Sequence, residues 1–108
     1  MTVNEIAKRL SLIPICVGDE EREVTGCHIG DLLSLVMSKA QSGDAWITIQ
    51  GNINVPAVAT LTDCAMVIVA EGINPDENAK NRAQQEGISI YSSPKSAYAL
   101  ACGIKECL

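Results

Sequence analysis

The stretch AMVIVA at residues 65–70 is the sequence feature that most constrains the fold. It places six apolar residues in a row, with no alternation between apolar and polar positions. A strand that is apolar on both faces needs cover on both faces, as central strands of parallel sheets have. We therefore expect residues 65–70 to form a central strand with helices packed on each side of the sheet.

Strands and helices alternate from residue 45 onward. AWITIQ (45–50) and ISIYSS (88–93) are rich in the residues that favour strands. NPDENAKNRAQQEG (74–87) is the clearest helix, with Asn74 as its cap, Pro75 and Glu77 in its first turn and Gly87 at its end. A last helix covers 93–108, with Ser93 as its cap. This order predicts a three-layer α/β/α sandwich with a mainly parallel sheet, as one domain over residues 1–108.

The first forty residues add two helices and two short strands to this scheme. Thr2 and Glu5 have the spacing of a capping box for a helix over 2–10. LIPICV (12–17) and VTGCHIG (24–30) are short extended segments, and the proline in the first suits a strand start or a sheet edge. Asp31 is expected to cap a helix that ends at Gly43. The expected apolar stripe of that helix is Leu32, Leu33, Val36, Met37 and Ala40.

The segment GNINVPAVATLTDC (51–64) allows two structures. Asn54 can cap a short helix that carries Pro56 in its first turn. Alternatively, GNIN can form the turn of a hairpin. The helix is the favoured interpretation.

Charge and cysteine content argue against several classes of protein. The formal net charge is −5 and no basic run exists, whereas nucleic-acid binding needs clustered Lys and Arg. The five cysteines include no C-x-x-C pair, which fits free, buried thiols in a reducing cytoplasm, with Cys107 as an exposed exception. No apolar run approaches the roughly 18 residues of a membrane span, and the polar N-terminus does not resemble a signal peptide. We expect a cytoplasmic protein without membrane or nucleic-acid partners.

The stretch GCHIGD (26–31) contains Cys27 beside His28, the only histidine. Neighbouring residues of a strand point to opposite faces, so these two side chains do not form a nucleophile–base pair. With one histidine and scattered thiols, we expect no catalytic residue, no metal and no cofactor. The alternative is that His28 lies at a ligand or subunit contact.

Polar residues follow three strands of the expected sheet. Ligands of open parallel sheets bind beyond the carboxyl ends of the strands. The acidic residues after 65–70 would repel a phosphate, whereas the serines and lysine after 88–93 surround a helix start and suit an anion. The candidate ligand-binding residues are Gln50, Gly51, Asn52, Asn54, Glu71, Gly72, Ser92, Ser93 and Lys95. No glycine-rich nucleotide loop, catalytic triad order or paired-carboxylate motif is present.

Three segments in this order resemble the DRTGG domain family. They are VTGCHIGDLLSLVM, GDAWITIQGNINVPAVATL and MVIVAEGINPDENAKNRAQQEGISIYSS, which together cover most of the chain. The family is similar to the N-terminal domain of HPr kinase/phosphorylase and to the middle region of long-form phosphotransacetylases. The resemblance implies a three-layer α/β/α domain, often dimeric, that accompanies regulatory or metabolic proteins and has no established catalytic activity of its own.

The chain departs from the motif that gives the family its name. Asn52 and Ile53 stand where an Asp-Arg pair is expected, and Ala70, Glu71 and Gly72 stand where Thr-Gly-Gly is expected. If those positions bind a ligand in relatives, this chain binds a different ligand or none. The first segment resembles the stand-alone branch of the family.

The residues and the resemblance together favour a non-enzymatic regulatory or ligand-sensing domain, with a small or anionic ligand. The alternatives are a small-molecule enzyme that uses the strand-end residues and a purely structural adaptor. We also expect a homodimer, because Leu35 lies off the apolar stripe of its helix and the last helix carries more apolar side chains than one face needs.

Overall fold

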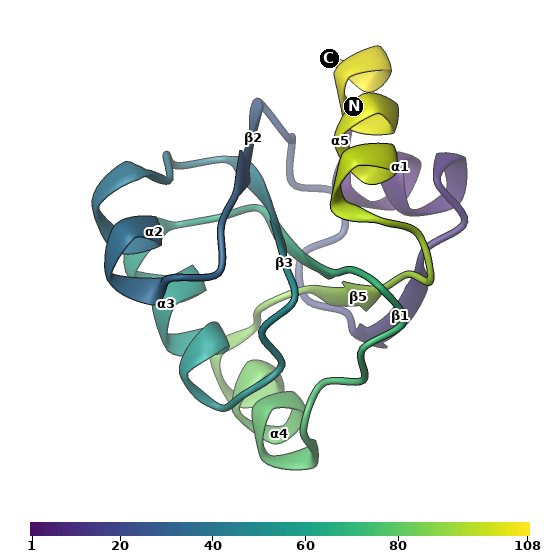
Figure 1. The fold of residues 1–108 in the computed structure, drawn as a ribbon. Helices are drawn as coiled ribbons and strands as arrows, with labels where there is room; N and C mark the ends of the chain where they lie inside the picture. Colours follow the sequence, from purple (N-terminus) through teal and green to yellow (C-terminus); the bar gives the residue numbers. More distant parts are fainter.

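A five-stranded sheet between two layers of helices organises the chain in the computed structural model, which describes all 108 residues (Figure 1). The elements are α1 (Val3–Arg9), β1 (Ile13–Cys16), β2 (Gly26–Ile29), α2 (Leu33–Lys39), β3 (Asp44–Thr48), α3 (Asn54–Thr62), β4 (Met66–Val69), α4 (Glu77–Glu86), β5 (Ile90–Ser92) and α5 (Ala97–Cys107). Segment 51–64 therefore forms the favoured helix and not the hairpin.

The strand order is β1-β5-β4-β3-β2, and every neighbouring pair is parallel except β1 with β5. β1 is the antiparallel edge strand and carries Pro14, with an irregular register between Pro14 and Cys16. β2 forms the other edge. The predicted three-layer α/β/α class with a mainly parallel sheet is confirmed.

β4 lies at the centre of the sheet, as the run AMVIVA predicts. Each of its four residues is at most 1% exposed, because helices cover both faces of the strand. Its neighbours β3 and β5 pair with it in register, so that Ile47, Ile68 and Tyr91 lie side by side across the sheet. The apolar run is thus explained by burial on two sides.

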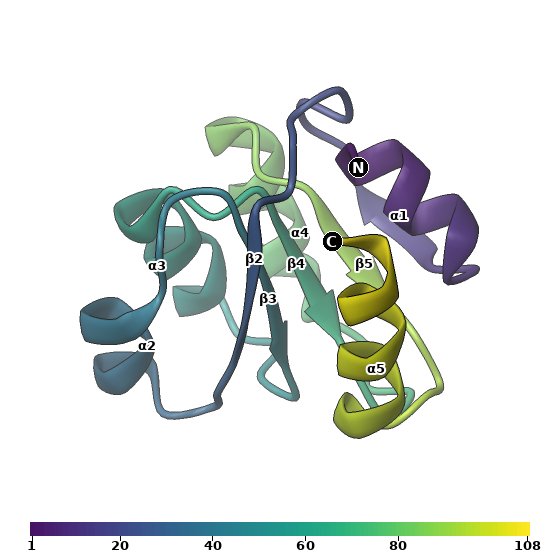
Figure 2. The same cartoon turned by 90° about the horizontal axis from the view of Figure 1, so that it is seen from above.

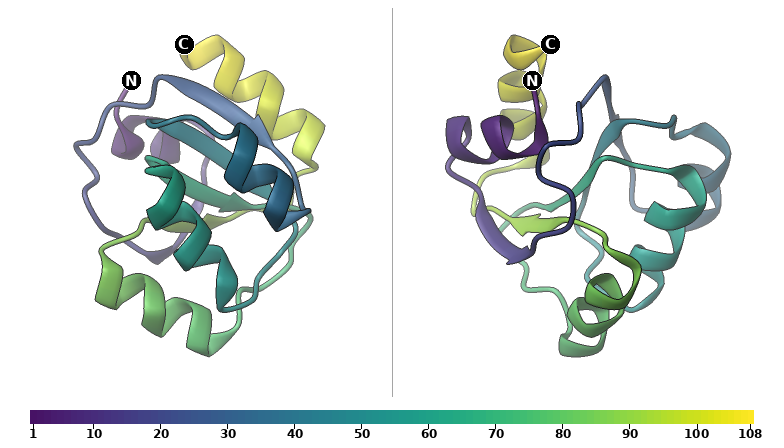
Figure 3. Two further views of the ribbon diagram at one scale, coloured as in Figure 1. Left: turned by 90° about the vertical axis from the view of Figure 1, so that its left-hand side faces the viewer. Right: turned by 180° about the vertical axis from the view of Figure 1, so that it is seen from behind.

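Helices α1 and α5 cover one face of the sheet, and α2, α3 and α4 cover the other (Figure 2). Alternate strand residues supply the two cores. Under α1 and α5 lie Ala45, Ile47, Met66, Ile68 and Tyr91, packed with Val3, Ile6, Leu100 and Ile104. Under the other three helices lie Trp46, Val67, Val69 and Ile90, packed with Val36, Val55, Val58, Ala59 and Ala83. The N- and C-terminal ends of the chain lie near each other (Figure 3).

Helix ends were predicted less well than helices. The capping box of Thr2 and Glu5 is present, and Gly87 ends α4 in the left-handed conformation, with φ 70°. Three predicted caps are wrong: Ile53, Asp76 and Ser96 occupy the cap positions where Asn54, Asn74 and Ser93 were expected. Of these three observed caps, only Ser96 accepts a hydrogen bond from the helix backbone, at Ala99 N.

The apolar stripe expected for 32–43 is correct for Leu33, Val36 and Ala40, which pack against the core, and wrong for Leu32 and Met37. Helix α2 is shorter than predicted and ends at Lys39, before Gly43, and Val36 is its only buried residue. Leu32 and Met37 are exposed, and so is Leu35, which the prediction placed off the stripe. Because α2 covers the edge strand β2, one side of the helix has no further strand to pack on.

Candidate functional site

The predicted site residues gather at the carboxyl ends of β3, β4 and β5, which lie along one edge because the three strands are parallel. The structure divides them into two groups. One group follows β3 and contains Gln50, Gly51, Asn52 and Asn54. The other joins the ends of β4 and β5 and contains Glu71, Gly72, Ser92, Ser93 and Lys95. We call the nine residues together the strand-end ledge.

Asp31 organises the first group, although it does not cap α2 as predicted. The cap position of α2 is Leu32, which makes no capping bond. One Asp31 carboxylate oxygen instead accepts from Thr48 Oγ1 at 2.9 Å and from Ile49 N at 2.8 Å. These bonds tie the end of β2 to the end of β3.

A chain of amides continues from this point along the first group. Gln50 Nε2 donates to Asp31 O at 3.3 Å, and Asn52 Nδ2 donates to Gln50 Oε1 at 3.2 Å. Asn52 Oδ1 accepts from Asn54 N at 2.9 Å, which fixes the start of α3. The amides are held in place by each other, and a ligand would meet a pre-organised row of neutral groups.

Gly51 allows the loop after β3 to approach the loop after β4. A Cβ at this position would lie 3.0 Å from Pro75 Cα and 3.2 Å from Asn74 O, closer than ordinary van der Waals contact with a backbone. Gly51 O accepts from Asp76 N at 2.8 Å. Gly51 therefore has a packing role that its place in a candidate site did not indicate.

The second group is built on a tight turn at the end of β4. Ile73 N donates to Ala70 O at 3.3 Å, and the two central residues, Glu71 and Gly72, have φ of 62° and 71°. Two positive φ values in succession define a type I′ turn, in which glycine is favoured. Glu71 therefore holds a strained backbone conformation.

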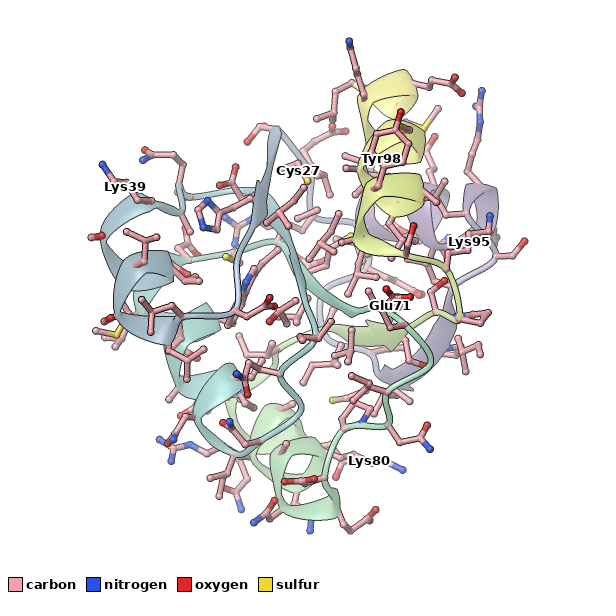
Figure 4. All side chains as sticks on the ribbon, viewed as in Figure 1. Cys27, Lys39, Glu71, Lys80, Lys95 and Tyr98 are labelled. Carbon is pink, nitrogen blue, oxygen red and sulfur yellow. The ribbon has the colours of Figure 1, made fainter.

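Backbone bonds join this turn to the loop after β5. Glu71 N donates to Lys95 O and Gly72 N donates to Ser93 O, both at 2.9 Å. Lys95 N in turn donates to Ser93 Oγ at 3.1 Å, and Ser92 is buried. The charged side chains of Glu71 and Lys95 are exposed, on the same side of the molecule (Figure 4).

The ledge offers hydrogen-bonding groups and two exposed charges, but no enclosed space. None of its nine residues lines any of the cavities of the molecule. It brings together no nucleophile with a base. A ligand would bind here by hydrogen bonds and charge on an open surface.

Cys27 and His28 lie on opposite faces of β2, as the sequence predicts. Cys27 pairs with Ala45 and faces α5 (Figure 4), whereas His28 pairs with Trp46, whose side chain belongs to the core on the other face. Desolvation, with a smaller contribution from the Asp44 carboxylate, raises the pKa of Cys27 to about 11, so the exposed residue carries a thiol and not a thiolate at neutral pH.

The other cysteines divide by burial. Cys16, Cys64 and Cys107 are buried, whereas Cys27 and Cys102 are exposed. The expectation of buried thiols is therefore wrong for Cys27 and Cys102, and the expectation of an exposed Cys107 is also wrong. Burial raises the pKa of Cys16 and of Cys64. No three His, Cys, Asp or Glu side chains gather closely enough to hold a metal ion, and no helix is both long and apolar enough to cross a membrane.

The sequence missed a groove between β2 and α5. Its volume is about 550 Å³ and its walls are mainly apolar, lined by Cys27, His28 and Ile29 from the strand and by Ile104 and Leu108 from the helix end. Ile29 is 52% exposed and Leu108 is 56% exposed. The groove arises because β2 is an edge strand, which only the pairing order reveals.

Comparison with known proteins gives one informative result. No family model matches the chain, and neither does any curated protein. The structure is similar to the crystal structure of the CBS and DRTGG domains of the regulatory region of Clostridium perfringens pyrophosphatase, complexed with its activator diadenosine tetraphosphate. The TM-score is 0.79 at 16% sequence identity, over 99% of this chain and 47% of that chain, so this chain spans about half of that structure. The chain has a DRTGG-like fold.

In this DRTGG-like fold, the positions where the family's name motif was expected lie at the ends of β3 and β4, within or next to the strand-end ledge. Asn52 and Ile53 follow β3, and Ala70, Glu71 and Gly72 form the turn after β4. Both central positions of this turn have positive φ, the backbone conformation that glycine adopts most readily. This chain keeps the turn with glutamate at the first of them.

Proposed function

We propose that the chain is a regulatory domain that senses a small ligand and has no catalytic activity of its own. The observation that carries this proposal is the DRTGG-like fold, because the similar structure is a regulatory region bound to a nucleotide activator. The absence of a nucleophile–base pair among the ledge residues is consistent with sensing. An enzyme would need convergent titratable groups around a pocket.

The strand-end ledge is the surface that we propose for this ligand. Lys95 supplies an exposed cation that makes no ion pair, and Gln50 and Asn52 supply neutral amides. The Glu71 carboxylate after β4 would repel an anion, so the anionic group of the ligand is expected beside Lys95. A small molecule with one anionic part and one neutral hydrogen-bonding part fits this arrangement.

A thermal-shift screen tests the proposal. The probes are adenosine mono-, di- and triphosphate, diadenosine tetraphosphate and inorganic phosphate. A ligand that binds only the folded state raises the melting temperature as its concentration increases. At a hundredfold excess over its Kd it adds about 2.7 kcal/mol to the free energy of unfolding. Lys95→Gln should weaken the response, and Lys39→Gln, on the surface of α2, should not. A response that is equal in both variants would contradict the ledge as the site.

We further propose that the domain acts as a homodimer joined at the β2 edge. The opposite edge is protected, since β1 carries a proline and an irregular register, whereas β2 has no charge, proline or bulge. Exposed apolar residues flank β2 on both sides, with Leu32 and Leu35 on α2 and Ile29 and Leu108 at the groove. Antiparallel pairing of β2 with its copy would bury both sets and join the two sheets.

Light scattering at micromolar concentration tests the dimer. A dimer has twice the monomer mass of 11.4 kDa. Leu35→Glu and Ile29→Lys should shift the protein toward monomer while the circular dichroism spectrum is retained, because both residues are about half exposed. Leu61→Glu is the matched control, since Leu61 is 74% exposed on α3. A wild-type protein of 11.4 kDa would end the idea of a dimer, and the groove would then favour the adaptor function with a different partner.

A further inference from the structure

A cavity of about 290 Å³ lies beside α1, and no residue of the strand-end ledge lines it. Its walls come from α1, from β1 with the residues that flank it, and from Tyr91 of β5. The cavity is separate from the groove at β2 and from the proposed sensing surface. Binding in this cavity is therefore independent of the proposed function.

Tyr91 is the most informative residue of this cavity. The residue is only 2% exposed, and its hydroxyl makes no hydrogen bond to any protein group. No fully buried side-chain polar atom in the molecule lacks a partner, so this hydroxyl keeps some access to solvent, and Tyr91 lines the cavity. Burial, with a smaller effect of Glu20, raises the pKa of the phenol, so it remains a hydrogen-bond donor.

Two opposite charges stand at the same cavity. Lys8 of α1 and Glu20 of the loop after β1 both line it, and neither forms an ion pair. Asn4 adds a side-chain amide that makes no hydrogen bond within the protein. The remaining walls are mainly apolar, from Leu12 and Val17.

Backbone hydrogen bonds hold the walls in place. Asn4 N donates to Glu20 O at 2.9 Å, and Val3 N donates to Arg22 O at 2.9 Å, so the loop after β1 is fixed to the start of α1. At the other end of α1, Leu12 N donates to Ala7 O at 2.8 Å. The cavity is thus formed before any ligand arrives, as small-molecule sites usually are.

We propose that this cavity binds a free α-amino acid with an apolar side chain. The ligand carboxylate would accept from the Tyr91 hydroxyl and meet the Lys8 ammonium, the ligand ammonium would meet Glu20, and the side chain would pack on Leu12 and Val17. Glu20 would repel a ligand that carries only negative charge, and Lys8 would repel a ligand that carries only positive charge. A cavity of about 290 Å³ is at the small end of the range for small-molecule sites, which suits an amino acid.

Isothermal titration calorimetry with L-leucine tests the proposal, with two analogues that each lack one charge, 4-methylpentanoate and 3-methylbutylamine. L-Leucine is expected to bind saturably, and each analogue at least about tenfold more weakly. Tyr91→Phe removes only the hydroxyl and should weaken L-leucine binding about five- to tenfold. Lys8→Gln and Glu20→Gln should each weaken it about tenfold or more.

The chain offers a matched control for each variant. Tyr98 is the only other tyrosine and is 79% exposed on α5, so Tyr98→Phe should leave binding unchanged. Lys39→Gln and Glu21→Gln serve in the same way, because neither residue lines the cavity. Tyr91→Phe should melt like the wild type, since its hydroxyl has no protein partner.

Three results would overturn the proposal. One is the absence of L-leucine binding at millimolar concentration. A second is binding without the proposed specificity, in which Tyr91→Phe and Lys8→Gln leave the affinity unchanged or an analogue binds as tightly as L-leucine. The third is a Tyr91→Phe protein that fails to fold, which would mean that the hydroxyl has a structural partner. A thermal shift with nucleotides that depends on Lys95 would test the strand-end ledge and not the cavity beside α1. The sensing proposal and the amino-acid proposal can therefore each fail without the other.

Discussion

Replacing Glu71 with glycine should stabilise the protein. Glu71 has φ 62° in the type I′ turn after β4, and its side chain makes no hydrogen bond or ion pair. An L-residue in the left-handed region costs about 1–2 kcal/mol. Glycine relieves that cost but loses about 0.5–1 kcal/mol through the greater freedom of the unfolded chain. The net gain is about 0.5–1 kcal/mol, which corresponds to a melting temperature about 2–8 °C higher.

Urea unfolding followed by the fluorescence of Trp46 measures this change, because Trp46 is the only tryptophan and is fully buried. Gly72→Ala is the matched control in the same turn. Its φ is 71°, and an added Cβ would lie 4.0 Å from Pro94 Cα, so the variant tests backbone strain without a clash. It should lose about 1 kcal/mol. A Glu71→Gly protein that is less stable than the wild type would refute the reasoning, and would indicate that the Glu71 side chain stabilises the turn.

Three further outcomes are expected from the geometry. Hydrogen bonds from Arg22 and Ser42 hold the pKa of Asp63 at about 2, below its ordinary 3.8, so Asp63→Asn should lower the urea midpoint at neutral pH. That difference should disappear as the pH falls from 3.8 to about 2, where the wild type loses the same stabilisation. An aromatic disulfide reagent should modify exposed Cys102 first and Cys27 slowly, since the pKa of Cys27 is about 11, and Cys102→Ser should remove the fast phase. Gly18→Ala should cost about 1–3 kcal/mol in urea unfolding, because its Cβ would lie 2.1 Å from Gly87 O.

Elements with an uninterrupted or strongly periodic pattern were predictable from the sequence. Residues 65–70 had to be covered on both faces, and together with the alternation of strands and helices after residue 45 this implied a parallel sheet with helices in both outer layers. The capping box at Thr2 and Glu5 is also purely local, because both partners lie within four residues of each other. Both features are signalled by residues that are close together in the sequence, so they can be recognised without knowing the tertiary contacts.

The sequence places polar residues near the helix ends correctly, but it does not predict which groups their side chains hydrogen-bond to. Asp31 stands where a cap would stand, yet its carboxylate bonds to Thr48 and Ile49, which come from a neighbouring strand. Ser93 likewise accepts from Lys95 N, and α5 begins four residues later. At each position the side chain can bond either to the backbone of the next helix or to a group elsewhere in the fold. Which of the two forms depends on the tertiary structure and cannot be predicted from the sequence.

The cavity beside α1 and the groove between β2 and α5 were not predictable, for a related reason. Tyr91 reads as an ordinary strand residue, and only the pairing of β5 with β1 brings it to the cavity beside α1. The groove at Ile29 and Leu108 needs β2 to be an edge strand next to α5. Both sites join segments that are far apart in sequence.

A nuclear magnetic resonance titration with the best ligand of the thermal-shift screen tests the sensing function most directly. Amide spectra report where the ligand binds, and the ligand's own spectrum reports whether it is converted. We expect saturable shifts centred on Gly51, Asn52, Glu71 and Gly72, with the ligand unchanged after prolonged incubation. Shifts confined to other parts of the molecule, or conversion of the ligand into a product that tracks the protein concentration, would contradict a non-enzymatic sensor at the strand-end ledge.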